Sequence, residues 1–228
     1  MMRAVMNPRV LNGLIVASAM LSIAASSWAL DSRVLLIGFK PLTTLLILLR
    51  AWPRGADARS ARRALRLGLM LSLLGDVVLL WPEQGFLPGL VAFLLAHIAY
   101  AVAFTREHRF LARPAALAGY ALAAGAVLAF LWSFIPAALR IPVACYVLAL
   151  TAMSAQTAVV GLASQGDDRR RGRLLMLGGA LFMTSDALLA TNRFAHALPA
   201  ATLWILGTYW AAQWCIASWL KPATPAPT

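Results

Sequence analysis

Residues 86–105 read FLPGLVAFLLAHIAYAVAFT, a run of 20 residues without an Asp, Glu, Lys or Arg. An α-helix rises about 1.5 Å per residue, so about 20 apolar residues cross the hydrocarbon core of a bilayer. The run therefore predicts a transmembrane helix, and it indicates that lipid is the solvent that the rest of the chain must satisfy.

Similar apolar stretches fill most of the 228 residues, which are 61% hydrophobic and 12% charged, with a mean hydropathy of +0.77. The alternating pattern of a membrane β-barrel is absent from the sequence. We predict an all-α polytopic membrane protein, an eight-transmembrane-helix bundle that forms one domain over residues 1–228. The helices are expected at about 10–30, 34–52, 64–81, 86–105, 114–134, 140–162, 173–190 and 199–220, followed by a short tail at 221–228.

The basic residues indicate the orientation of the bundle. The net charge is +12, but the arginines gather in alternate loops instead of one patch, so we predict no nucleic-acid partner. The odd-numbered loops hold only Arg33, Arg140 and Arg193, and the positive-inside rule then places both termini in the cytoplasm, with a bacterial inner membrane expected. Residues 1–29 also resemble a signal peptide that would be cleaved near 27–29, which would leave the other helices in the same orientation.

A weak internal repeat is visible in two segments. Residues 71–80 read LSLLGDVVLL and residues 181–190 read LFMTSDALLA, with Asp76 and Asp186 in register 110 residues apart. This spacing is close to half the chain and spans four helices, so it suggests a parallel 4+4 repeat.

Four ionisable side chains fall inside the predicted spans: Lys40, Asp76, His97 and Asp186. Asp76 is expected roughly 7 Å inside the outer end of its helix, and the others at similar depth. A charge at a helix centre costs about 2.5–3.5 kcal/mol on insertion scales, so such groups persist mainly where they face a cavity or each other. They predict a site in the non-cytoplasmic half of the membrane. A structural Lys–Asp pair is the alternative, but it would leave the second carboxylate and the histidine unexplained.

Other polar residues recur on the same helix faces as these four. Ser72 lies one turn before Asp76, and Tyr100 lies one turn after His97. Each tyrosine has an alternative role in packing or at the membrane interface. The candidate substrate-binding or supporting residues are Lys40, Ser72, His97, Tyr100, Tyr146, Ser185, Tyr209 and Gln213.

Two carboxylates in different surroundings can divide into a general acid and a general base, which suits the cleavage of ethers and acetals through an oxocarbenium-like state. We therefore predict Asp76 and Asp186 as catalytic residues, without assigning which is the acid. A single histidine within the spans argues against a three-ligand zinc site, and the sequence contains no GxSxG motif of a serine lipase. We predict no metal and no cofactor.

The ordered set Lys40-Pro41, LSLLGD (71–76), GLVAFLLAHIAY (89–100), LFMTSDALLA (181–190) and YWAAQ (209–213) resembles the YhhN family of membrane proteins, which includes lysoplasmalogenases. The resemblance implies a membrane hydrolase that cleaves the vinyl-ether bond of a lysophospholipid, giving a fatty aldehyde and a glycerophospho head group. It implies a lysophospholipid substrate and membrane lipids as partners. Two other readings remain open: a proton- or ion-coupled transporter that uses the same buried residues, and a membrane scaffold or receptor without catalysis.

Overall fold

The computed structural model describes residues 7–26, 32–81, 83–110 and 112–222, and within them it is all-helical. The predicted count of eight helices is confirmed. They are α1 (Pro8–Ala25), α2 (Arg33–Ala51), α3 (Arg59–Val78), α4 (Phe86–Phe104), α5 (Pro114–Leu131), α6 (Ala137–Ala163), α7 (Arg169–Ala190) and α8 (Ala201–Trp219). A 3-10 turn, η1 (Gly166–Asp168), precedes α7, and a π-helical turn, η2 (Thr191–Ala195), continues it.

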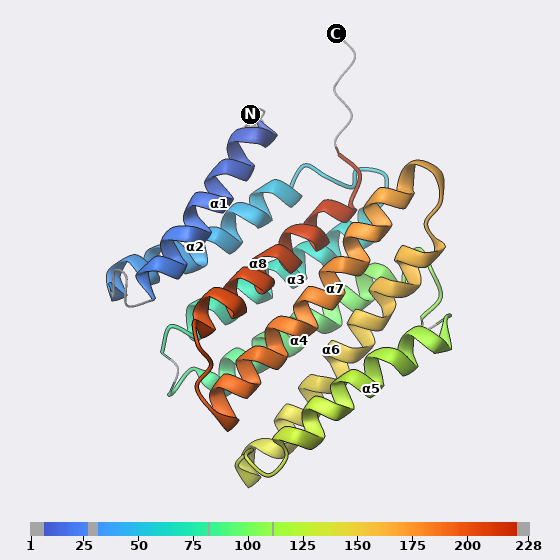
Figure 1. Ribbon diagram of the computed structural model, residues 1–228. Coiled ribbons are helices and arrows are strands. Elements are labelled where there is room, and N and C mark those ends of the chain that lie inside the picture. Colours follow the sequence, from blue (N-terminus) through green and yellow to red (C-terminus); the bar gives the residue numbers. More distant parts are fainter. Residues whose placement is uncertain (1–6, 27–31, 82, 111, 223–228) are drawn as a thin grey trace.

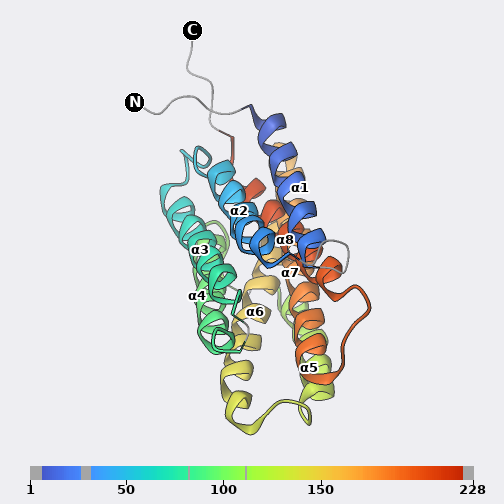
Figure 2. The same ribbon diagram turned by 90° about the vertical axis from the view of Figure 1, so that its left-hand side faces the viewer.

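The helices form one elongated bundle (Figure 1). Helices α3, α4, α7 and α8 lie in its middle, with the α1–α2 pair on one side and the α5–α6 pair on the other. Figure 2, turned by 90°, shows the α5–α6 connection at the same end of the bundle as the end of α7. Two of the loops that the sequence assigns to the non-cytoplasmic side, α5–α6 and α7–α8, therefore lie at one end.

The surface and the composition of the helices fit a lipid environment. Among the described residues, six helical segments are long and apolar enough to cross a membrane: α1, α2, α4, α5, α6 and Gly166–Ala195, which joins η1, α7 and η2. Helix α3 falls short because it begins in an arginine-rich segment, and α8 because tyrosine, tryptophan and glutamine lower its hydropathy. Large apolar side chains such as Val34, Leu122 and Ile141 are 75–80% exposed, which is the pattern of a surface that faces lipid.

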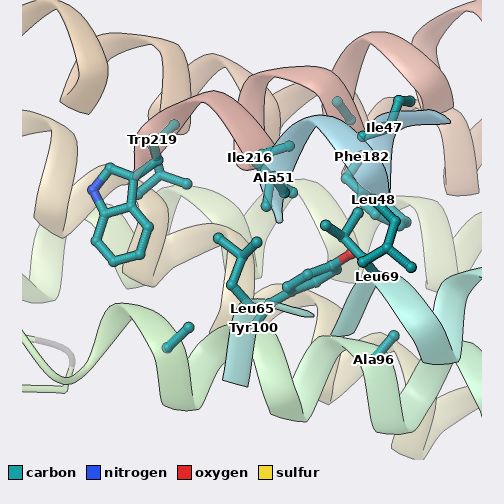
Figure 3. Packing of buried hydrophobic residues seen from close by; sticks show 14 of the residues in the cluster. Ile47, Leu48, Ala51, Leu65, Leu69, Ala96, Tyr100, Phe182, Ile216 and Trp219 are labelled. Atoms are coloured by element: carbon teal, nitrogen blue, oxygen red, sulfur yellow. The ribbon is translucent and has the colours of Figure 1, made fainter. Parts of the chain in front are cut away.

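Close helix packing in the middle of the bundle depends on glycine. A Cβ atom added to Gly68 of α3 would run into the ring of Tyr100 on α4, and one added to Gly178 of α7 would lie 3.1 Å from Cys215 on α8. Lipid gives no hydrophobic force between helices, so small residues that allow close van der Waals contact stabilise such pairs. Figure 3 shows Tyr100 in the resulting core beside Leu65 and Leu69.

Polar contacts attach α1 to its neighbours. The hydroxyls of Ser18 and Thr43 lie 2.8 Å apart between α1 and α2. The guanidinium of Arg50 donates to Asn12 on α1 and to Ser218 on α8. Helix α1 is thus an integrated part of the bundle, whereas the expected cleavage site at 27–29 lies outside the described residues.

Candidate active site

Asp76 lies in the last turn of α3, with its side chain buried among three helices. Its Oδ2 accepts hydrogen bonds from Thr44 Oγ1 of α2, at 2.6 Å, and from Tyr209 Oη of α8, at 2.8 Å. Helix α3 ends at Val78, so Asp76 is about 3 Å from the helix end and not roughly 7 Å as expected. The difference arises because the apolar residues after Val78 form a turn.

A chain of hydrogen bonds continues from this carboxylate through the core. Tyr209 Oη accepts from Gln213 Nε2 at 3.2 Å, and Gln213 Oε1 accepts from Tyr100 Oη at 2.7 Å. Tyr100 Oη also lies 3.4 Å from Ser72 Oγ. Four of the supporting residues predicted from the sequence thus form one network with Asp76. We refer to these five residues and Thr44 as the Asp76 network.

Asp186 of α7 belongs to a second group of polar side chains, the Asp186 network. Its Oδ2 accepts from Tyr146 Oη of α6 at 2.5 Å and lies 3.5 Å from His97 Nε2 of α4. Tyr146 Oη and His97 Nε2 are 3.0 Å apart. Tyr146 has one proton and donates it to the carboxylate, so the proton between Tyr146 and the imidazole belongs to His97 Nε2.

One aromatic ring lies between the two networks. Phe182 makes edge-to-face contacts with His97, at 4.7 Å between ring centroids, and with Tyr209, at 5.6 Å. No hydrogen bond among the described residues joins Asp76 directly to Asp186. The two carboxylates therefore occupy neighbouring networks that meet across Phe182, instead of forming one shared pair.

Two predicted site residues make no hydrogen bond to these networks among the described residues. Lys40, one turn before Thr44 on α2, makes no ion pair within 4.0 Å with a described carboxylate, but its charge interacts with the carboxylate of Asp76 at longer range. The hydroxyl of Ser185 donates to the carbonyl of Ile205, at 2.9 Å, and so connects α7 to α8.

Sequence reasoning missed Thr44 and Phe182. Thr44 could have been found from its spacing, because it lies one helical turn after Lys40. Phe182 gave no signal, since a single phenylalanine in an apolar helix has the same appearance as any core residue.

An apolar pocket opens beside the Asp186 network. It has an empty volume of about 820 Å³, open side included, and it lies among α4, α5, α6, α7 and η2. Its walls include Leu90, Leu128 and Val143, and of the described lining residues only Tyr146 and Asp186 have polar side chains. Asp76 does not line the pocket.

Metal binding receives no support from the described residues, in which no three His, Cys, Asp or Glu side chains are grouped closely enough to hold an ion. The polar groups on the pocket wall are a carboxyl group and a phenol, and both contact the imidazole of His97, which does not itself line the pocket.

The apolar helices and the carboxylates held between them define an integral membrane protein, a helical bundle with polar networks inside it. The chain belongs to the YhhN family, which it matches over residues 35–220. The resemblance inferred from the sequence motifs is therefore confirmed.

Three relatives illustrate this membership. Lysoplasmalogenase TMEM86A of Homo sapiens is 36% identical over 155 residues, which cover 66% of this chain and 62% of the human protein. Lysoplasmalogenase TMEM86B of Sus scrofa is 37% identical over 173 residues, or 76% of this chain and 69% of the relative. The uncharacterized membrane protein YhhN of Escherichia coli O157:H7 is 41% identical over 69 residues, or 30% of this chain and 33% of the relative. No solved structure matches this chain.

Proposed function

We propose that this chain hydrolyses the vinyl-ether bond of lysoplasmalogen-type lysophospholipids, releasing a fatty aldehyde and a glycerophospho head group. The observation that carries the proposal is the carboxylate of Asp186 on the wall of an otherwise apolar pocket. Two relatives that align with 66% and 76% of this chain are named lysoplasmalogenases, which supports the same activity. The pocket takes the alkenyl chain, and membrane lipid surrounds its open side.

Asp186 acts as the general acid, because it is the carboxyl group that a chain in the pocket can reach. Its proton goes to the vinyl-ether carbon that is not bonded to oxygen, which leaves an oxocarbenium ion at the neighbouring carbon. Tyr146 then donates a hydrogen bond to the carboxylate that remains, and His97 Nε2 lies 3.5 Å from the same oxygen. Donors already aimed at a group where negative charge develops lower the barrier without reorganisation.

Asp76 acts as the base that activates water. Its Oδ2 is held by Thr44 and Tyr209, while its Oδ1 accepts no hydrogen bond from a described residue. Water loses a proton to Asp76 and adds to the oxocarbenium carbon, which gives a hemiacetal. The hemiacetal hydroxyl returns a proton to Asp186, the carbon–oxygen bond to glycerol breaks, and Asp76 protonates the departing oxygen. One water is consumed, and both carboxyl groups regain their starting state.

The two networks also support the 4+4 repeat that the sequence suggests. Asp76 on α3 is contacted from α2 and α8, and Asp186 on α7 is contacted from α6 and α4, which are the corresponding helices of the other half. Leu65 and Leu175, 110 residues apart, are both fully buried. We propose that the halves are parallel repeats, that all eight helices cross the membrane, and that the termini are cytoplasmic with the site toward the other side.

The comparisons do not favour the alternative of a proton- or ion-coupled transporter, because relatives over 66% and 76% of this chain are named as enzymes.

The test is aldehyde release by the purified protein in detergent. A 1-alkenyl lysophospholipid should release one aldehyde per head group. Its 1-alkyl counterpart, with the same chain and head group but no double bond to protonate, should release none. If the 1-alkenyl substrate gives no aldehyde, the proposed function is wrong.

A further inference from the structure

Two arginines contact residues that line the apolar pocket. The guanidinium of Arg193, in η2, lies over the ring of Phe86 at 5.2 Å. Arg140, in the first turn of α6, donates from Nε to the carbonyl of Ile135 at 3.3 Å. Phe86 and Ile135 both line the pocket, so each arginine is attached to a different part of its rim.

Neither guanidinium is neutralised by a side chain that the structure describes. No described carboxylate lies within 4.0 Å of Arg140 or of Arg193, although Arg171 and Lys221 elsewhere in the chain do form ion pairs. The rings of Trp132 and Phe86 orient the two cations, which is an arrangement that leaves the guanidinium edges free to donate. These edges match the geometry of a phosphate group.

The position of the arginines relative to Asp186 suits a lysolipid. Arg193 is seven residues beyond Asp186 along α7 and η2, about 10 Å along a helix axis. In a lysoplasmalogen, the phosphorus is six covalent bonds from the oxygen-bonded vinyl carbon and seven from the carbon that Asp186 protonates, a distance that a flexible arginine side chain can match. Figures 1 and 2 place the start of α6 and the end of α7 at the same end of the bundle.

The charge distribution of the whole chain also singles out these residues. Only three of the 20 basic residues occupy the loops assigned to the non-cytoplasmic side, namely Arg33, Arg140 and Arg193. Two of the three flank the pocket. Arg33 instead begins α2, on the far side of the bundle from α5 and α6 (Figure 1).

We propose that Arg140 and Arg193 form the phosphate subsite of the pocket and hold the head group of a lysophospholipid while its chain lies against Asp186. This subsite rests on the proposed function, because it assumes that the pocket takes the alkenyl chain. It makes the enzyme selective for phosphate-bearing ether lipids over the corresponding 1-alkenylglycerols.

The experiment compares Arg140→Gln, Arg193→Gln and the control Arg33→Gln on two substrates with the same chain, a 1-alkenyl lysophosphatidylcholine and a 1-alkenylglycerol. Each of the first two variants should raise KM for the phospholipid about tenfold, as expected for the loss of one charge-assisted contact, with kcat little changed. KM for the 1-alkenylglycerol should not change, and Arg33→Gln should behave as wild type on both. Arg140→Lys and Arg193→Lys should recover part of the loss, which verifies that charge and not folding is responsible.

Equal effects on both substrates, or no effect on the phospholipid, would overturn the subsite. The assays use non-ionic detergent and phosphate-free buffer. An arginine effect that appears only in phospholipid vesicles would assign the arginines to bulk membrane lipid and would also overturn it.

Binding of the uncleavable 1-alkyl lysophosphatidylcholine separates this proposal from the proposed function. Arginine-dependent binding without aldehyde release from the alkenyl substrate would retain the subsite and reject the hydrolase. Aldehyde release together with binding that does not depend on the arginines would retain the hydrolase and reject the subsite.

Discussion

The phenolic oxygen of Tyr146 lies 2.5 Å from Oδ2 of Asp186, and both side chains face an otherwise apolar pocket. Tyr146 comes from α6 and Asp186 from α7, so the contact depends on the packing of the two helices. It places a hydrogen-bond donor against the carboxylate at the one polar part of the described wall. A reaction at that wall would use both groups.

Replacement of Tyr146 by phenylalanine tests the importance of this contact. Because a hydrogen bond to a charged group contributes about 1.5–3 kcal/mol, we expect Tyr146→Phe to lower kcat about ten- to a hundredfold, with little change in KM. Steady-state aldehyde release measures both constants. Tyr120→Phe, on α5 and outside both networks, is the matched control and should keep full activity. Equal kcat values in the two variants would exclude a catalytic contribution from Tyr146.

A larger side chain in the pocket wall should narrow the pocket and so change the preference of the enzyme for the length of the alkenyl chain. Ala124 of α5 is buried and lines the pocket, so Ala124→Phe removes space that a long alkenyl chain would occupy. At about 0.8 kcal/mol for each methylene that no longer fits, two lost methylenes lower kcat/KM for the long chain about tenfold. For shorter chains, kcat/KM should stay close to the wild-type value. Ala123→Phe, which faces outward, should leave the ratio of the two kcat/KM values unchanged, and a similar change in both variants would argue against this pocket as the chain site.

The stability of the central helices should depend on glycine at their closest contact. In Gly68→Ala the new methyl group would overlap the ring of Tyr100, and we expect a loss of about 1–3 kcal/mol in the free energy of unfolding. Gly119→Ala has no heavy atom within 4 Å of the new Cβ and serves as the control. Unfolding of both variants in detergent measures the difference. A Gly68→Ala protein as stable as the control would contradict the close α3–α4 packing.

The sequence was sufficient to predict the eight helices, because apolar runs long enough to cross a bilayer have few other structures open to them. It also located the ionisable residues that form the two networks. The predicted start of α3 at residue 64 was too late, because the helix begins at Arg59. A pattern of apolar residues cannot detect a helical turn that is rich in arginine.

The arrangement of the site was less accessible from the sequence. Which polar residue contacts which carboxylate depends on helix packing, so the partners of Asp76 and Asp186 could not be assigned in advance. The pocket gave no signal either, because α5 contributes only apolar side chains such as Ala124 and Leu128 to it. These residues have the same sequence pattern as a surface that faces lipid.

The most direct test of the two-carboxylate mechanism is the rate of aldehyde release from a 1-alkenyl lysophospholipid by Asp186→Asn and Asp76→Asn, compared with wild type. General acid–base groups contribute about 10²–10⁴-fold, and we expect a loss in that range for each variant, while the loop variant Glu107→Gln keeps full activity. Full activity in both aspartate variants would contradict the mechanism.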